Sequence, residues 1–347
     1  MNAILQNGAS REVSFDTALF REIEQGLDSA RPERSRTPAR VLGFGEISAV
    51  LTFDSVPEAS GWVFKRLPVF ATEDAADAHA ALTAHYVELI RQRAGIDVQE
   101  TVYFNVPVRD GLVVFYAAQR ALPSNHIGSA ILNWAPDDAC LALFESVLRQ
   151  VEKVWEFNRT SADGNELAID LQLSNWAVIS DDAKPTITCD TPLTYIDITT
   201  PLLRSGGVEQ LNTQAFIRGC PILLRWPVRK FMAEGVVSRY YEPRTCVMDV
   251  IGNCIKEGRE DLVPAMVDVA NAFFAKKPAS LKINPLTVAD VFRYYRQDAA
   301  IFVIFLALKR MDRLIKSGLM RQPYDYILPE RIERHFPWSN TPRSRKR

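Results

Sequence analysis

Apolar residues recur along this chain with two different periods. Near the start they repeat every four residues, at Phe15, Leu19, Ile23 and Leu27. This spacing predicts an amphipathic helix that docks on another element. Residues 31–40 follow with two prolines and alternating charges, which predicts a linker. Residues 1–40 are therefore expected to form an N-terminal helix and linker ahead of the main domain.

The next segment favours strands. Residues 41–67 contain three β-prone stretches separated by turn-forming residues, which predicts an antiparallel meander. Residues 74–93 are rich in alanine, lack Pro and Gly, and predict a long helix. Two further strands, 101–108 and 111–119, are joined through Asp110-Gly111, a strong hairpin signal. The expected order is three strands, one helix and two strands.

Beyond Pro123 the pattern becomes mainly helical. Residues 137–158 carry an apolar stripe with helical spacing, and short strands are expected near 176–179 and 193–198. We expect an α+β fold with a small antiparallel β unit, residues 41–121, and a larger mainly α unit, residues 122–337. Residues 338–347 are basic and are expected to form a disordered tail.

Composition narrows the class of protein. The chain has 347 residues, 47% apolar content and a formal net charge of -1, so it can bury a large core and has no global field for nucleic acid or anionic membranes. Its five cysteines include no CxxC pair, so no zinc cluster is indicated. The longest apolar run, residues 299–308, is too short to span a bilayer. We expect a cytoplasmic protein without nucleic-acid or membrane partners; the sequence leaves its oligomeric state open.

The first candidate for chemistry is a glycine-containing turn between two predicted strands. Gly43, Gly45, Ser48 and Val50 follow the register GxGxxGxV, with serine at the third glycine position. Glycines at such a turn let backbone N–H groups approach phosphate oxygens. An ordinary hairpin explains the same residues equally well.

A lysine follows in the third predicted strand. Lys65 lies fifteen residues after Val50 and is flanked by apolar residues, a position from which an ammonium group can bind nucleotide phosphates and a helix glutamate. Arg66 could act in its place, or Lys65 could face solvent. In the predicted helix, Glu88 is the single glutamate and is the candidate partner of Lys65.

The main catalytic candidate lies in the helical half. Asp170 and Asn175 match the pattern D-L-x-x-x-N and are followed by a short apolar strand. An aspartate five residues before an asparagine suits phosphoryl transfer, with Asp170 orienting or deprotonating an acceptor hydroxyl and Asn175 holding a magnesium ion. Asp197, at the end of the next apolar strand, is the second candidate magnesium ligand. Asp190, closer to Asn175, is its rival.

Taken together, residues 41–204 resemble the protein-kinase-like superfamily, and most closely its aminoglycoside phosphotransferase and choline kinase branches. The resemblance implies a bilobal fold, bound ATP and Mg²⁺, and a small hydroxyl-bearing acceptor. It assigns Lys65 to the phosphates, Asp170 to the acceptor, and Asn175 with Asp197 to magnesium. Gln119 to Leu122 would form the hinge whose backbone reads adenine.

The chain also departs from that pattern. Ala168 stands where both branches usually have His, the gap between Asn175 and Asp197 is long, and no Ala-Pro-Glu segment follows. A nucleotide-binding pseudokinase and a nucleotidyltransferase therefore stay open beside a phosphotransferase. Residues 197–204 also resemble an uncharacterised bacterial group of kinase-like proteins. The acceptor cannot be deduced, because Glu234, Glu242 and Asp249 are too scattered in sequence to define a cationic site.

Overall fold

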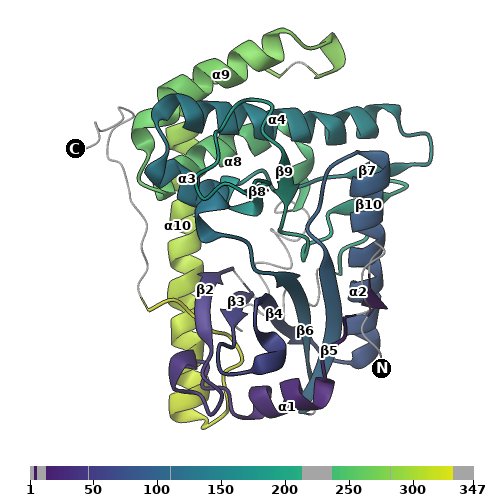
Figure 1. Ribbon diagram of the computed structural model, residues 1–347, viewed down its shortest axis with the longest axis vertical. Helices are drawn as coiled ribbons and strands as arrows, with labels where there is room; N and C mark the ends of the chain where they lie inside the picture. The colour runs from purple at the N-terminus through teal and green to yellow at the C-terminus, as the bar shows by residue number, and fades with distance from the viewer. Residues whose placement is uncertain are drawn as a thin grey trace.

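The fold is a mixture of antiparallel sheet and helices. The computed structural model describes residues 4–5, 13–45, 47–109, 111–212, 237–281 and 283–330. A six-stranded sheet occupies one end of the molecule, and most of the helices gather at the other end (Figure 1). The α+β class expected from the sequence is therefore confirmed.

The sheet is antiparallel throughout, with strand order β1-β5-β6-β4-β3-β2. Its strands are β1 (Ile4–Leu5), β2 (Arg40–Phe44), β3 (Ala49–Thr52), β4 (Trp62–Phe70), β5 (Thr101–Arg109) and β6 (Leu112–Arg120). Arg109 pairs with Leu112, and Gly111 between them has φ 71°. A left-handed residue at this position is what a two-residue hairpin requires, so the predicted hairpin is confirmed.

Helix α2 (Glu73–Glu88) connects β4 to β5 and packs against one face of the sheet. Thr72 caps its N-terminus by accepting a hydrogen bond from the Ala75 N–H. A single π-type turn, Leu89–Arg93, continues it toward β5. The predicted helix is thus confirmed, and the last five residues of the predicted range, 89–93, form the π-type turn.

Helix α1 (Thr17–Gln25) packs against the opposite face of the sheet. Phe20 is fully buried there and its ring lies edge-on to those of Phe53 and Phe104, at centroid distances of 5.8 and 4.8 Å. Such aromatic contacts add to the free energy of burial. The sequence predicted a helix ahead of the main domain. In the structure this helix is part of the core on one face of the sheet.

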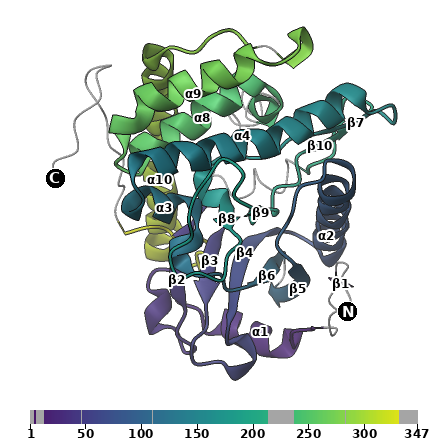
Figure 2. The same ribbon diagram turned by 45° about the horizontal axis from the view of Figure 1, so that its top comes forward.

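The other end of the molecule contains α3 (Gly128–Trp134), α4 (Asp137–Thr160), α8 (Pro243–Lys256), α9 (Val263–Ala275) and α10 (Val288–Arg313). Figure 2 shows α4, α8 and α9 side by side. Two small sheets lie beneath them: β8 (Trp176–Val178) with β9 (Leu193–Tyr195), and β7 (Asn165–Leu167) with β10 (Leu203–Ser205) and β11 (Val208–Glu209). The strands β7, β10 and β11 were not expected from the sequence.

Short helical turns connect these elements. The 3-10 turns are η1 (Pro32–Arg34), η2 (Pro57–Ala59), η4 (Ser124–His126), η5 (Leu173–Asn175), η7 (Arg239–Tyr241), η8 (Glu260–Leu262) and η9 (Ala279–Leu281). A π-type segment, η10 (Leu314–Leu319), prolongs α10. None of the described helices is long and apolar enough to cross a membrane.

Helix α10 runs the length of the molecule from the helical end to the sheet end (Figure 1). The chain after it returns to the sheet: Ile327 is buried beside α1, and the Arg66 guanidinium donates to the Asp325 carbonyl at 2.6 Å. Residues 325 and 327 therefore contact the sheet end from beyond the predicted boundary at residue 121. The predicted tail, residues 338–347, lies outside the described residues.

Candidate functional site

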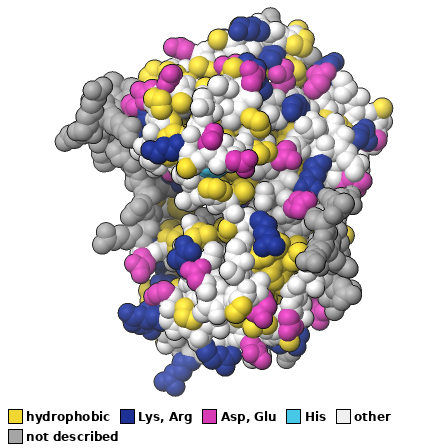
Figure 3. Space-filling view, viewed as in Figure 1, with side chains coloured by type: hydrophobic (Ala, Val, Ile, Leu, Met, Phe, Trp, Pro, Cys, Tyr) yellow, Lys and Arg dark blue, Asp and Glu magenta, His cyan; other side chains and the backbone are white. Residues whose placement is uncertain are grey.

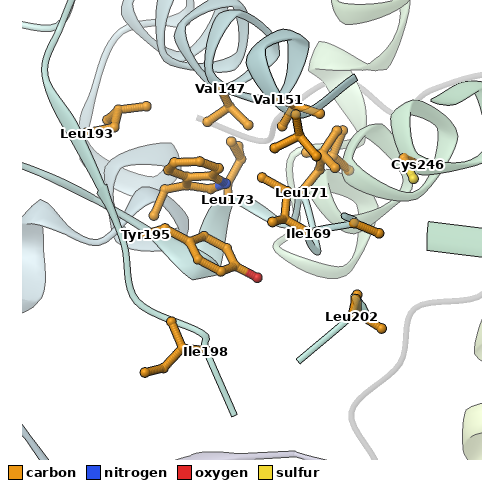
Figure 4. Close-up of a cluster of buried hydrophobic side chains, with 14 of the residues drawn as sticks. Val147, Val151, Ile169, Leu171, Leu173, Leu193, Tyr195, Ile198, Leu202 and Cys246 are labelled. Atoms are coloured by element: carbon orange, nitrogen blue, oxygen red, sulfur yellow. The ribbon is translucent and has the colours of Figure 1, made fainter. Parts of the chain in front are cut away.

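The segment from Ile169 to Leu173 is held by alternating side chains. Ile169, Leu171 and Leu173 are buried in the core against α4, where Figure 4 shows them near Val147 and Val151. In an extended segment, alternate side chains point to opposite sides. Asp170 is therefore directed away from the apolar core, and it is partly exposed.

Two buried tyrosines support this segment. Tyr86 of α2 donates from Oη to the Ala168 carbonyl at 2.7 Å, and the Asp170 N–H donates to Tyr195 Oη at 3.3 Å. In the sequence, Ala168 stands where the kinase-like branches usually have His. The structure supplies support from Tyr86 and Tyr195, which sequence spacing could not reveal.

Asn175 lies between Asp170 and Asp197. The Asn175 side-chain amide donates to the backbone carbonyl of Asp170 at 3.4 Å. The backbone carbonyl of Asn175 accepts from the Ile196 N–H at 2.9 Å. The following residues pair as the β8–β9 hairpin, with Trp176 opposite Tyr195. This pairing brings Asn175 opposite Ile196, the residue before Asp197, which is why the long gap in sequence does not separate the two parts of the chain.

Lys65 forms an ion pair with Asp197. Its Nζ lies 2.5 Å from Asp197 Oδ1, and both side chains are about a quarter exposed, at 22% and 26%. Thr199 Oγ1 donates to the same carboxylate oxygen at 3.4 Å. Lys65 also lies in a row across the sheet, opposite Val50 of β3, which in turn lies opposite Gly43 of β2. Three of the predicted nucleotide residues therefore share one row.

Gln119 connects the end of β6 to Asp197. Its side-chain amide donates to the Ile196 carbonyl and to Thr101 Oγ1, both at 3.0 Å. The Tyr195 N–H also donates to the Asp97 carbonyl at 2.9 Å. The chain just before and around Asp197 is thus bound on several sides to residues of the sheet end.

The expected pairing of Glu88 with Lys65 is not found. Glu88 is the last residue of α2, is 53% exposed, and lies 3.9 Å from His85. The buried residues of α2 are Ala76, His79, Ala80, Thr83, Tyr86 and Val87. Helical geometry turns Glu88 away from the face that these residues form. Lys65 is paired with Asp197 instead.

His79 occupies the buried face of α2 instead. Its ring lies 5.0 Å from the rings of both Phe70 and Phe115, and burial lowers its pKa to about 4, while a hydrogen bond with the Thr199 backbone acts in the opposite direction. It is therefore neutral at pH 7. His79 thus links α2 to the segment that carries Asp197.

Asp190, the rival of Asp197, lies elsewhere. Its side chain is 79% exposed and pairs with Arg149 of α4 at 2.7 Å. Asp197, and not Asp190, lies beside Lys65. The alternative that Arg66 replaces Lys65 also fails, because Arg66 is buried on the other face of the sheet with Glu24, at 2.6 Å.

The glycine turn forms a tight hairpin between β2 and β3. The Gly45 N–H donates to the Ser48 carbonyl at 2.9 Å, and a Cβ on Gly45 would collide with the Ser48 hydroxyl. The predicted hinge follows β6: the Ala121 N–H donates to the Gly61 carbonyl at 2.9 Å, and Leu122 is the next residue, partly exposed. Backbone contacts to adenine remain a prediction.

A second carboxylate, Asp249 of α8, lies near Asp170. Gln172 joins them: its backbone N–H donates to Asp170 Oδ1 at 3.1 Å and its side-chain amide donates to Asp249 Oδ2 at 3.4 Å. Asp249 also accepts from the Tyr294 hydroxyl at 3.0 Å. Burial, and then the negative charge of Asp249, raise the pKa of Asp170 to about 7. The sequence could not associate Asp249 with this site, because 79 residues separate it from Asp170.

The donor set suits a magnesium ion held together with phosphates. Within the described residues no group of three or more His, Cys, Asp or Glu side chains could hold a metal ion. Mg²⁺ is commonly bound through one or two protein oxygens together with phosphate and water. Asn175 and Asp197 offer one amide and one carboxylate oxygen, which are ligand types that suit that mode of binding.

Comparison with known proteins places the chain in a family without assigning a reaction. No curated protein matches it. One family model matches residues 23–314, a range that contains Lys65, Asp170, Asn175, Asp197 and Asp249. The chain therefore belongs to the family of unknown function DUF6206.

Proposed function

We propose that this protein is an ATP- and Mg²⁺-dependent phosphotransferase that acts on a hydroxyl group of a small molecule. The observation that carries the proposal is the meeting of Lys65, Asp197 and the loop of Asp170 and Asn175, which come from three separate parts of the chain. Their order was expected from the sequence alone. A bilobal kinase-like arrangement is part of the proposal, and the strand order with α2 between β4 and β5 supports it.

Each residue has a role that follows from its chemistry. Lys65 would bind nucleotide phosphates through its ammonium group. Asn175 and Asp197 would hold Mg²⁺, which supplies charge neutralisation at the transferred phosphoryl group when ATP is bound. Asp170 would accept a hydrogen bond from the acceptor hydroxyl and take up its proton. A carboxylate with a pKa of about 7 is well matched to that role at neutral pH.

A nucleotide-binding pseudokinase is the second candidate. One observation favours it: no carboxylate on the buried face of α2 accompanies Lys65, which binds Asp197 directly. A direct pair between the phosphate-binding lysine and a metal ligand must open before either can serve a nucleotide. A protein that binds nucleotide without transferring phosphate would retain the same site.

Transfer from γ-labelled ATP to a pool of small hydroxyl compounds, measured in a single turnover, tests the phosphotransferase. Asp170→Asn should abolish transfer while ATP binding persists, because the amide cannot take up the acceptor proton. Asp190→Asn, an exposed acid away from the site, should retain full transfer. Equal transfer by the wild type and Asp170→Asn would show that Asp170 is not the catalytic base.

Nucleotide binding itself can be measured without an acceptor. ATP with Mg²⁺ at about 100 times its dissociation constant should stabilise the fold by about 2.7 kcal/mol, detected as a thermal shift. Asp197→Asn should remove the magnesium-dependent part of this shift, and Lys65→Met should weaken it further. Binding without transfer would favour the pseudokinase, and no shift at saturating ATP would contradict both candidates.

A further inference from the structure

A surface at the end of α10 combines exposed apolar and basic side chains. Five large apolar residues lie within ten positions there, with exposed fractions from 37% to 82%: Met311, Leu314, Ile315, Leu319 and Met320. Soluble domains expose single apolar residues commonly, but a contiguous group of this kind marks an interaction site. We call this group, together with Arg313, Lys316 and Arg321, the α10 terminal patch.

The charge of this region differs from that of the whole chain. Residues 309–325 contain five Lys or Arg and two Asp residues, whereas the formal net charge of the chain is -1. Within the described residues, Arg313 and Arg321 form no ion pair, while Lys316 pairs with Asp312 at 3.0 Å. The basic side chains of the patch are therefore mostly available to an anionic partner.

A second basic segment lies beside the patch. Tyr324 connects the two: its ring lies 5.7 Å from Lys316 Nζ, its hydroxyl donates to the Lys309 carbonyl, and its carbonyl accepts from Ser29 Oγ. Residues 31–36, just beyond Ser29, add three arginines and one glutamate. Figure 3 shows Lys and Arg side chains at the lower left of the molecule, where the yellow end of α10 lies in Figure 1.

We propose that the α10 terminal patch binds an anionic membrane surface, with its apolar side chains in the interface and its basic side chains against lipid headgroups. Leu314 and Leu319 are 70% and 82% exposed in the π-type segment that prolongs α10. Interfacial helices combine apolar and basic residues in this way, and each basic residue near an anionic surface adds to the attraction.

Nucleic acid fits this surface less well. Proteins bind it through basic side chains and stacked aromatic rings, and Tyr324, the aromatic residue of the patch region, is buried at 6% exposure. Exposed leucine, isoleucine and methionine contribute nothing to phosphate contacts. The proposed contact is with the surface of a membrane and does not require a spanning helix, which the described residues do not contain.

Flotation of the full chain with vesicles tests the proposal. Vesicles of phosphatidylcholine containing a third phosphatidylserine should bind the wild type, pure phosphatidylcholine should bind it much less, and added salt should weaken the binding. The double variant Leu314→Ser/Leu319→Ser should lower binding about tenfold or more. Arg313→Gln and Arg321→Gln should each lower it about fivefold.

Controls separate this contact from its alternatives. Ile179→Ser, an exposed apolar residue on the loop after β8, should bind vesicles as the wild type does. Each variant should keep the wild-type melting temperature, because the substituted side chains are exposed. The inference is overturned if the wild type does not float with anionic vesicles, or if Leu314→Ser/Leu319→Ser floats equally well.

Two other results would also overturn it. If light scattering shows a dimer that Leu314→Ser/Leu319→Ser converts to a monomer, while vesicle binding is absent, the patch joins two copies of the chain; Ile301 and Ile304, exposed on the same helix, would extend that interface. If the patch variants lose binding to a duplex oligonucleotide and not to vesicles, the partner is nucleic acid. Neither result depends on the proposed phosphotransferase.

Discussion

Burial and the charge of Asp249 raise the pKa of Asp170 to about 7. Ionisation of Asp170 should therefore lower the free energy of unfolding as pH rises. In the unfolded chain its carboxyl ionises near pH 4. Between these two pH values the unfolded state has released a proton that the folded state retains. The stabilising contribution of Asp170 to the free energy of unfolding is therefore full below about pH 4 and lost by about pH 7. Asp170→Asn should remove this dependence and be more stable than the wild type at pH 8, by a few kcal/mol.

The measurement is urea unfolding between pH 5 and 8 in the presence of a metal chelator. The gain in stability of Asp170→Asn over the wild type should shrink as pH falls toward 5. Asp190→Asn provides the control, because Asp190 is 79% exposed and its substitution should leave the wild-type pH dependence unchanged. Parallel pH profiles for the wild type and Asp170→Asn would contradict the assigned environment of Asp170.

The single residues of the site were partly predictable. Local patterns, an aspartate five residues before an asparagine and a lysine within an apolar strand, selected Asp170, Asn175 and Lys65, which the structure brings together. Glu88 was wrong as the partner of Lys65, since alanines occur on several faces of α2 and the sequence gives little signal of the helix's orientation. Asp249 reaches the site only through tertiary packing, which no local pattern encodes.

At the scale of elements, the contact between α3 and the segment of Asp170 depends on one glycine. Gly128, at the start of α3, is packed so closely against Leu173 that a Cβ would overlap the Leu173 carbonyl oxygen. Gly128→Ala should therefore displace this backbone and destabilise the protein by about 1–3 kcal/mol. It should also weaken phosphotransfer if Asp170 is the base, because Leu173 anchors the same segment.

Gly252→Ala provides a matched comparison. Gly252 lies inside α8, and a Cβ there would make an ordinary contact with Tyr295 at 3.6 Å. Because alanine favours helix over glycine by up to about 1 kcal/mol, this variant should be as stable as the wild type or more so. Equal melting temperatures for Gly128→Ala and Gly252→Ala would contradict the close contact with Leu173.

The elements themselves were predicted where their signals are local. Long strands with β-branched and aromatic residues, such as β4 and β6, and the apolar stripe of α4 are visible in sequence because neighbouring positions define them. The three-residue strands β7 and β10 were missed. They form because residues 165–167 and 203–205 pair across the fold, and three residues are too few to establish a period of two.

At the scale of the whole molecule, a buried ion pair ties α1 to the sheet and to the end of the chain. Arg66 and Glu24 are 3% and 2% exposed at 2.6 Å, and Arg66 also binds the Asp325 carbonyl. Glu24→Gln leaves a buried guanidinium without its counter-charge, so it should destabilise the protein by about 3–5 kcal/mol. Urea unfolding at pH 7 measures this loss.

An exposed ion pair in the same sheet is the control. Arg40 and Asp54 lie 3.0 Å apart with side chains 61% and 66% exposed. Asp54→Asn should leave the urea midpoint nearly unchanged, because water solvates both groups. If Glu24→Gln also leaves the urea midpoint nearly unchanged, water or another group must bind the Arg66 guanidinium in place of Glu24. The contacts that join α1, β4 and residue 325 would then stabilise the protein less than their geometry indicates.

The return of the chain to the sheet has a consequence for how this protein is made. Ile327 and the Asp325 carbonyl complete a core whose other members all lie before residue 120. During synthesis that core stays open, and Arg66 lacks one of its partners, until residues 325 and 327 have left the ribosome. The sheet end cannot finish folding as an early unit, so nascent chains that stop before residue 325 should be preferred substrates for chaperones and proteases.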